Sequence, residues 1–337
     1  MKSTSLNALD TAIVDDHIYA LVKRGKRLSL SVFDKDLNFV DEIWSAEGQK
    51  GFILKIDKNR ALLGIDDRLY LVEDGEAEAV LTASVLGNLF WHLAEVSGKL
   101  FVVHEYGETP TAIYVSSDLR NWERAVTNLD IDRYSRHFHY VAYDPYRKWL
   151  IATLGDGCLT RAAISEDLGS SWKPLYRGPW QFVPILVLKD KLMFGMDSGI
   201  ARGGIGVYDV DKHRWSFIFL KWRGKDVKFA QMCDLKLLNN GLYIAGLGTP
   251  QAIVVSLDMK TWHLAYAEGF DERFNMHVSI SKGKDFIACS TGKSLLLLTK
   301  DELKLLPQAS DLVIVNYRAC IERLRGLGFN LKHRLLY

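Results

Sequence analysis

The stretch Ser165–Trp172 reads SEDLGSSW, and two shorter stretches resemble it: SSDLRNW at Ser116–Trp122 and SLDMKTW at Ser256–Trp262. Each follows a run of β-forming residues and precedes another short run of the same kind. An Asp in such a position accepts hydrogen bonds from nearby backbone N–H groups, and a Ser adds another. The Trp can then fold back over the hairpin and bury a large apolar surface. The pattern predicts a tight turn between two antiparallel strands.

Degenerate versions of this turn fill the rest of the chain. Including them, an Asp recurs at positions 34, 74, 118, 167, 209, 258 and 301. Repeats of about 45 residues hold about four short strands, which is one blade of a β-propeller. The sequence therefore predicts an all-β, seven-bladed β-propeller over residues 1–308, with six blades as the alternative because the first two repeats are the most degenerate. The predicted blades span about 9–45, 50–82, 88–127, 136–177, 180–222, 228–267 and 273–308.

The tail from 309 to 337 differs from the repeats. Ser310 or Asp311 could cap a short helix running to about Leu324, and glycines at 326 and 328 would end it. We expect this helix to pack on the propeller. Two alternatives are a helix that binds a partner or a membrane surface, and a closing strand over 312–315.

Composition narrows the class of protein. The 43 basic and 41 acidic residues leave a net charge of +2, which argues against a nucleic-acid binder because such proteins need a concentrated basic face. No apolar run approaches the roughly 20 residues that span a bilayer. The first nine residues lack the apolar stretch of a secretion signal, and the four cysteines form no CxxC pair. We expect a reduced, cytoplasmic protein, with a disulfide between distant blades as the alternative.

The turns also carry a resemblance to a known family. Ser165–Trp172 matches the pattern S-x-D-x-G-x-[ST]-W, and so resembles the Asp-box or BNR repeat of sialidase-like propellers. Arg136–Pro145 and the Leu154-Gly155-Asp156 stretch are similar to glycosyl-hydrolase-like members of that group. The resemblance implies the propeller fold and leaves the function open among sialidases, other glycosidases, polysaccharide lyases and binding modules. The arginine triad of a sialidase cannot be assigned here, so a classical sialidase is not expected.

Propeller geometry brings distant residues together. Strands A and B run antiparallel, so the start of strand A and the end of strand B lie at the same mouth of the central channel. Histidines and carboxylates at these positions could bind a divalent metal ion or carry acid–base chemistry. The candidate catalytic residues are His92, His139, His277, Asp156 and Glu105, and the candidate metal ligands are His92, His139 and His277. The candidate substrate-binding residues are Arg136, His137, Trp91, Trp180, Gln181 and Asp197.

Two functions fit this pattern. The first is a glycan-directed propeller, either a glycosidase- or lyase-like enzyme or a carbohydrate-binding relative, in which Arg136 holds an acidic group of the ligand. The second is a non-catalytic scaffold that docks a protein partner. A plain structural interpretation also stands beside both, because polar residues at a wet channel mouth can simply bind water and backbone.

Overall fold

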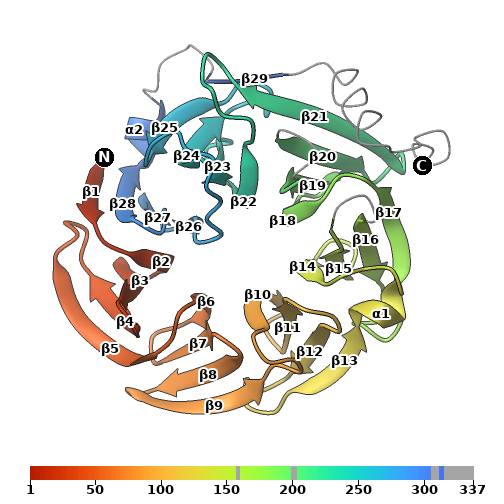
Figure 1. The fold of residues 1–337 in the computed structure, drawn as a ribbon, viewed down its shortest axis with the longest axis horizontal. Helices are drawn as coiled ribbons and strands as arrows, with labels where there is room; N and C mark the ends of the chain where they lie inside the picture. Colours follow the sequence, from red (N-terminus) through yellow and green to blue (C-terminus); the bar gives the residue numbers. More distant parts are fainter. Residues whose placement is uncertain (157–159, 199–202, 305–310, 315–337) are drawn as a thin grey trace. The chain divides into compact units, whose positions relative to one another are not determined.

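A computed structural model describes residues 1–156, 160–198, 203–304 and 311–314 of the 337-residue chain. Apart from two short helices, α1 (Asn128–Ile131) and α2 (Lys300–Lys304), its regular structure is all strand, arranged in seven antiparallel sheets. The sheets are the blades of a seven-bladed β-propeller (Figure 1), which confirms the predicted fold class. No helix in the described part of the chain is long and apolar enough to cross a membrane.

The chain divides into two compact units, of which the first holds blades 1, 2, 6 and 7. Each of blades 1, 2 and 6 is a four-stranded meander, whereas blade 7 takes its outermost strand from the N-terminus, because β1 pairs with β28. In chain order the strands are β1 (Lys2–Ser5), β2 (Ala8–Val14), β3 (His17–Arg24), β4 (Arg27–Phe33), β5 (Phe39–Glu47), β6 (Gly51–Ile56), β7 (Arg60–Ile65), β8 (Arg68–Glu73), β9 (Glu76–Thr82), β22 (Gln231–Leu237), β23 (Tyr243–Thr249), β24 (Gln251–Ser256), β25 (His263–Ala267), β26 (Ser279–Lys282), β27 (Phe286–Ser290) and β28 (Ser294–Thr299).

The second unit holds blades 3, 4 and 5, together with Lys228–Met232 at the start of β22. Its strands A, the first strand of each blade, pack side by side in the order β10, β14, β18 (Figure 1). The strands are β10 (Leu89–Val96), β11 (Leu100–Tyr106), β12 (Ala112–Ser116), β13 (Glu123–Thr127), β14 (Phe138–Asp144), β15 (Trp149–Leu154), β16 (Thr160–Ser165), β17 (Lys173–Gly178), β18 (Phe182–Val187), β19 (Lys191–Met196), β20 (Gly204–Asp209) and β21 (Arg214–Trp222).

Only a few residues of the predicted tail helix lie in the described part of the chain. β29 (Leu312–Ile314) is a strand that joins the sheet of β21. These residues thus follow the alternative of a closing strand and not the predicted helix. Residues 305–310 and 315–337, which would carry the rest of the predicted helix, lie outside the described part of the chain.

The Asp-containing stretches form the turns between strands C and D, the third and fourth strands of a blade. Asp118 accepts hydrogen bonds from the backbone N–H groups of Arg120 and Asn121, at 2.9 and 2.8 Å. Asp258 does the same for Lys260 and Thr261, and Asp167 accepts the N–H of Ser171. These bonds satisfy backbone N–H donors that the turn would otherwise leave without a partner. The Asp side chain of each of these turns therefore stabilises its own hairpin.

The Trp that follows each of these turns folds back over it. The indole Nε1–H donates to the carbonyl of Leu119, Gly169 or Met259, at 2.9 to 3.1 Å. Trp122 and Trp172 stay partly exposed, whereas Trp262 is completely buried. The segment around Asp311 explains the difference, because Asp311 and Leu312 both donate their backbone N–H groups to the carbonyl of Trp262.

Neighbouring blades bury apolar faces against each other. In the second unit, Phe182 and Phe194 of blade 5 share one core with Ile151 of blade 4, and Phe138 of blade 4 shares another with Val102 of blade 3. In the first unit, equivalent cores join blade 1 to blade 2, blade 6 to blade 7 and blade 7 to blade 1. At about 25 cal/mol per Å² of apolar surface, this burial is the main stabilising term of the fold.

Partly buried aspartates link strand A of one blade to strand A of the next. Asp10 accepts the N–H of Thr11 in its own strand and that of Ile53 in β6, at 2.8 and 2.9 Å. Asp234 in β22 repeats the arrangement with Leu235 and with Ile280 in β26, both at 2.8 Å. Burial raises the pKa of Asp10 to about 6, although these hydrogen bonds favour its charged form.

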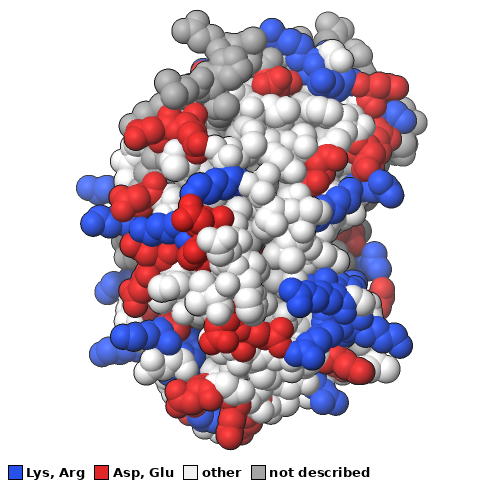
Figure 2. All heavy atoms as spheres, turned by 90° about the vertical axis from the view of Figure 1, so that its left-hand side faces the viewer, with Lys and Arg blue, Asp and Glu red and all other residues white. Residues whose placement is uncertain are grey.

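The outer surface carries both signs of charge in mixture. Figure 2 shows Lys and Arg side chains interspersed with Asp and Glu on the face that it draws. Exposed ion pairs such as Lys35–Asp16, at 2.9 Å, belong to this mixture. The face drawn in Figure 2 therefore shows no single-sign field of the kind that steers nucleic acids.

The buried Trp262 and its partly exposed counterpart Trp122 allow a matched test of the turn. We expect Trp262→Ala to lower the free energy of unfolding by about 3–5 kcal/mol, because it opens a cavity beneath the segment around Asp311. Trp122→Ala removes the same indole hydrogen bond from a partly exposed site and should cost less than half as much. Urea unfolding of both variants measures the difference, and equal losses would contradict this account of the Trp262 environment.

Candidate functional site

Strand A of blade 3 and strand A of blade 4 each contain a β-bulge, and several ring side chains of the site lie at these bulges. In β10 the pairing register shifts between Phe90 and Leu93, so Trp91 and His92 lie in the irregular part of the strand. In β14 the register shifts between Phe138 and Tyr140, and His139 lies there. A bulge leaves a residue outside the regular ladder and redirects its side chain.

Gly107, which follows β11, fixes the orientation of the His137 ring. His137 Nδ1 lies 2.5 Å from the carbonyl oxygen of Gly107. Gly107 has a φ of +145°, and a Cβ at this position would meet the Asn88 side chain at 2.2 Å, so no other residue fits. A carbonyl oxygen only accepts, so Nδ1 carries the proton and Nε2 points away from Gly107.

Asp156 lies two residues after the end of β15 and contacts three ionisable side chains of blade 4. Its carboxylate lies 3.1 Å from Arg136 Nη1, 3.5 Å from His137 Nε2 and 3.2 Å from His139 Nε2. Both histidine side chains are almost fully buried, whereas the Asp156 side chain is 33% exposed. Among the described residues, His137, His139 and Asp156 form a cluster whose potential ligand atoms all lie within 4.8 Å of one another.

The imidazoles and the carboxylate are close without being aligned as hydrogen-bond partners. His137 Nε2 and both ring nitrogens of His139 are buried and make no well-formed hydrogen bond within the described part of the chain. Such buried polar atoms are costly unless something else satisfies them. These ring nitrogens are therefore available to bind a ligand.

Burial and charge set the protonation states of this region. Burial lowers the pKa of His139 even though Asp156 favours its charged form, so His139 is neutral at pH 7. Burial alone would raise the pKa of Asp156, but its contacts with His137 and His139 hold that pKa well below the usual range. Nearby, burial lowers the pKa of His104 to about 3.

Aromatic rings from blades 3 and 4 surround the cluster. The Tyr106 ring centroid lies 4.5 Å from that of His137 and 5.7 Å from that of His139. The His92 ring lies 4.0 Å from Tyr140 and 4.8 Å from Trp91. Trp91 is buried, while His92, Tyr106 and Tyr140 keep partly exposed rings.

Glu105 and Trp180 occupy structural positions. Both Glu105 carboxylate oxygens are engaged, by the backbone N–H and hydroxyl of Ser84 and by the hydroxyl of Tyr114, and the side chain is fully buried. Trp180 is buried in the core between blades 4 and 5, with its ring 4.9 Å from Phe219. The structure thus gives each a packing role in place of the predicted contact with substrate.

His277 and His92 also lie outside the cluster that could hold a metal ion. His277 belongs to the first unit, where its ring stacks on Phe52 at 5.0 Å, and burial lowers its pKa to about 4. His92 stacks on His104, with 3.4 Å between their ring nitrogens. Of the predicted ligands His92, His139 and His277, only His139 belongs to the cluster that the described residues form, which consists of His137, His139 and Asp156.

A second group of predicted residues meets at blade 5. Asp197, directly after β19, is buried and accepts hydrogen bonds from the side-chain amides of Gln231, at 2.9 Å, and Gln181, at 3.4 Å. Burial, with a contribution from the charge of Asp156, raises the pKa of Asp197 to about 8. A carboxyl group that is mostly protonated at pH 7 is a hydrogen-bond donor, so this group is a poor anchor for a cation.

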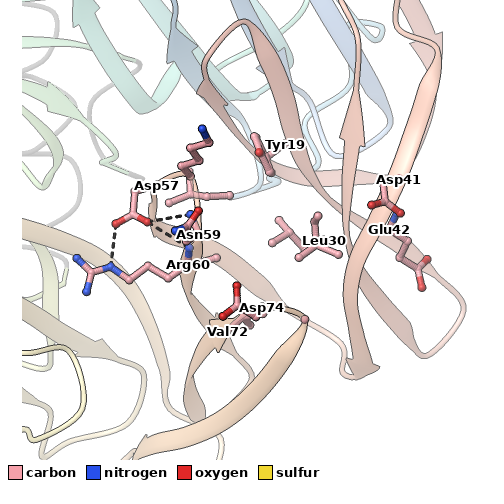
Figure 3. Close-up of a pocket in the computed structure, with 14 residues that line it drawn as sticks. Tyr19, Leu30, Asp41, Glu42, Asp57, Asn59, Arg60, Val72 and Asp74 are labelled. Atoms are coloured by element: carbon pink, nitrogen blue, oxygen red, sulfur yellow. Dashed lines mark hydrogen bonds and ion pairs between the residues drawn. The ribbon is translucent and has the colours of Figure 1, made fainter.

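A pocket of about 360 Å³ between blades 1 and 2 is a weaker candidate site (Figure 3). Asp41, Glu42, Asp57 and Asp74 contribute carboxylates to its lining. Asp57 is occupied by Arg60, whose Nε lies 2.8 Å from it, and by backbone N–H groups of its own turn. Exposed carboxylates of this kind are ordinary surface features.

Sequence reasoning missed four contributors to the blade 3–4 site: Tyr106, Gly107, Glu108 and Tyr140. Gly107 acts through its carbonyl group, which leaves no side-chain signal. Tyr106 is the last residue of strand B, β11, and Glu108 lies in the loop after it; the propeller argument had already assigned the end of strand B to the site. Applying the rule that the end of strand B lies at the site to the following loop as well would have found Tyr106 and Glu108.

Comparisons with known proteins support the fold alone. No family model matches the chain, and no curated protein matches its sequence. Among solved structures, YCF48 bound to D1 peptide matches with a TM-score of 0.57 and 13% identity, over 89% of this chain and 95% of that one. The GH74 enzyme of Niastella koreensis matches with a TM-score of 0.52 and 11% identity, over 87% and 66%.

The extracellular domain of BT4673 from B. thetaiotaomicron matches with a TM-score of 0.57 and 10% identity, over 88% of this chain. The aligned region spans only 38% of the length of that domain. At such low identities these neighbours establish a β-propeller and carry no assignment of activity.

Asp197 allows a test of the electrostatics. Its pKa in the folded protein, about 8, is above the value of 3.8 for an unperturbed carboxyl, so the folded state binds the proton more tightly and stability falls as pH rises from about 4 to about 8. In Asp197→Asn this loss is absent, so the variant should gain more than about 1 kcal/mol on the wild type between about pH 5 and pH 8. Urea unfolding at both pH values, with the exposed Asp271→Asn as control, measures this gain. A constant difference between variant and wild type would refute the buried-carboxyl account.

Proposed function

We propose that the chain binds an acidic carbohydrate at the site shared by blades 3 and 4, with Arg136 holding a carboxylate of the sugar. The observation that carries this proposal is the position of the Arg136 guanidinium. It is 53% exposed and lies between two carboxylates, Asp156 at 3.1 Å and Glu108 at 2.9 Å. A guanidinium in this setting offers a planar, charge-assisted donor pair to an acidic ligand.

Glu108 is the partner that a ligand can displace. Its side chain is 72% exposed, and exposed ion pairs contribute only about 0–1 kcal/mol. Asp156 is the fixed partner, because His137 and His139 flank its carboxylate from the buried side. A sugar carboxylate can therefore replace Glu108 while Asp156 keeps the guanidinium in place.

The surrounding rings suit the rest of a sugar. Tyr106 and Tyr140 are partly exposed and lie beside the histidines. Their faces offer apolar surface to the C–H groups of a pyranose ring, while their hydroxyl groups can hydrogen-bond to its hydroxyls. A site that combines one cationic clamp with partly exposed rings favours a uronate-containing oligosaccharide over a neutral one.

Binding of a trimer of galacturonate, compared with a trimer of galactose, tests the proposal. We expect saturable binding of the acidic trimer by isothermal titration calorimetry and much weaker binding of the neutral one. Arg136→Gln should weaken binding of the acidic trimer by about 10- to 100-fold, the range expected for a lost hydrogen bond to a charged group.

Arg27→Gln is the matched control. Arg27 is a similarly exposed arginine, 59% against 53%, and it pairs with Glu42 on the outer strands of blade 1. Its replacement should leave binding unchanged. Equal affinity for the acidic and neutral trimers, or equal losses in the two arginine variants, would remove the proposal.

A further inference from the structure

We infer that His137, His139 and Asp156 bind a divalent transition-metal cation, through Nε2 of each imidazole and the carboxylate. The inference concerns the same site as the proposed carbohydrate binding but goes beyond it, since it follows from the arrangement of these three side chains alone. It also changes the ligand set expected from the sequence, which combined His139 with two histidines that lie elsewhere.

The first argument is the orientation of the His137 ring. Its Nδ1 donates to the carbonyl oxygen of Gly107, so Nε2 is the ring nitrogen left to bind a ligand. Nε2 lies 3.5 Å from Asp156 Oδ2 and is buried without a hydrogen-bond partner among the described residues. A cation beside Nε2 would satisfy this atom.

The second argument is the spacing of the ligand atoms. The cation binds nitrogen and oxygen ligands at about 2.0–2.2 Å in a tetrahedral zinc site, so two ligand atoms lie roughly 3.3–3.5 Å apart. Asp156 Oδ1 lies 3.2 Å from His139 Nε2, and Oδ2 lies 3.5 Å from His137 Nε2. One ligand atom from each of the three residues lies within 4.8 Å of the other two, so the three can approach one ion.

The third argument is the support around the ligands. Metal-binding histidines generally donate their other ring N–H to a carbonyl or carboxylate, and metal-binding carboxylates are themselves hydrogen-bonded. Gly107 supplies that carbonyl for His137, and Arg136 binds Asp156 Oδ2 at 3.1 Å. Oδ1, on the His139 side of the carboxylate, is left for the cation.

The chemistry of the ligands selects the kind of ion. Two neutral imidazoles and one carboxylate suit zinc, manganese, iron or cobalt better than magnesium or calcium, which prefer oxygen ligands. Three protein ligands also leave an open coordination position, and the 33% exposure of Asp156 gives access to it. A sugar carboxylate held by Arg136 would lie next to that position.

The test uses the full chain, stripped of metal with a chelator and titrated with Zn²⁺ near neutral pH. We expect about one equivalent to bind per chain, and Co²⁺ to give the visible absorption of a low-symmetry site with nitrogen and oxygen ligands. Asp156→Asn and His137→Phe should each weaken Zn²⁺ binding by about 100-fold or more, since even outer-shell changes cost 10- to 100-fold. The exposed His213→Gln and Asp271→Asn should bind as the wild type does.

Unfolding of the metal-free proteins guards against a misfolded variant, because a folded variant unfolds cooperatively, as the wild type does. Stoichiometric Zn²⁺ binding that survives both ligand variants, or no Zn²⁺ binding at all, would overturn the inference. No carbohydrate is present in this test, so the cation and the carbohydrate can fail independently.

Discussion

The burial of an apolar face between each blade and its neighbour is the constraint on which the rest of the structure depends. In the second unit it packs β10, β14 and β18 side by side, with Phe138 in the core shared by blades 3 and 4. Three of the ring side chains at or near the site lie where the ladder of strand A is interrupted. The bulges after Phe90 and Phe138 place Trp91, His92 and His139 in this way. The site is thus a consequence of how the blades pack.

The fold could be predicted because its signal is local and repeated. Asp118, Asp167 and Asp258 make their turn hydrogen bonds within five residues, and a Trp covers each of these three turns, so the sequence itself contains the interaction. The tail could not be treated this way. Leu312 is buried in a strand that pairs with β21, a partner far away in the sequence. The β-branched residues at 313 and 314 favour a strand, but the helical spacing of apolar residues further along favoured a helix.

The site could be predicted only as far as the antiparallel pairing of strands A and B determines it. His137 and His139 stand two residues apart, and Asp156 comes two residues after the end of the neighbouring strand. Antiparallel pairing therefore brings them together, and this much follows from the sequence. Assigning roles required knowing where each side chain points. Glu105 turns into a buried network with Ser84 and Tyr114, and the predicted ligand His277 stacks on Phe52 in the other unit. The sequence pattern cannot distinguish a residue at a strand end that faces the site from one that faces the core.

The blade 3–4 site combines a fixed buried half and an adaptable exposed half. Gly107, His137, His139 and Asp156 form the fixed half, and Arg136 with Glu108 forms the other. The central claim is that the fixed half is a metal centre. Anomalous diffraction at the zinc absorption edge, from crystals grown with Zn²⁺, tests it most directly. The account predicts a peak at about 2.0–2.2 Å from His137 Nε2, His139 Nε2 and the Asp156 carboxylate. Ordered side chains at this site without a peak, or zinc only on the outer surface, would contradict it.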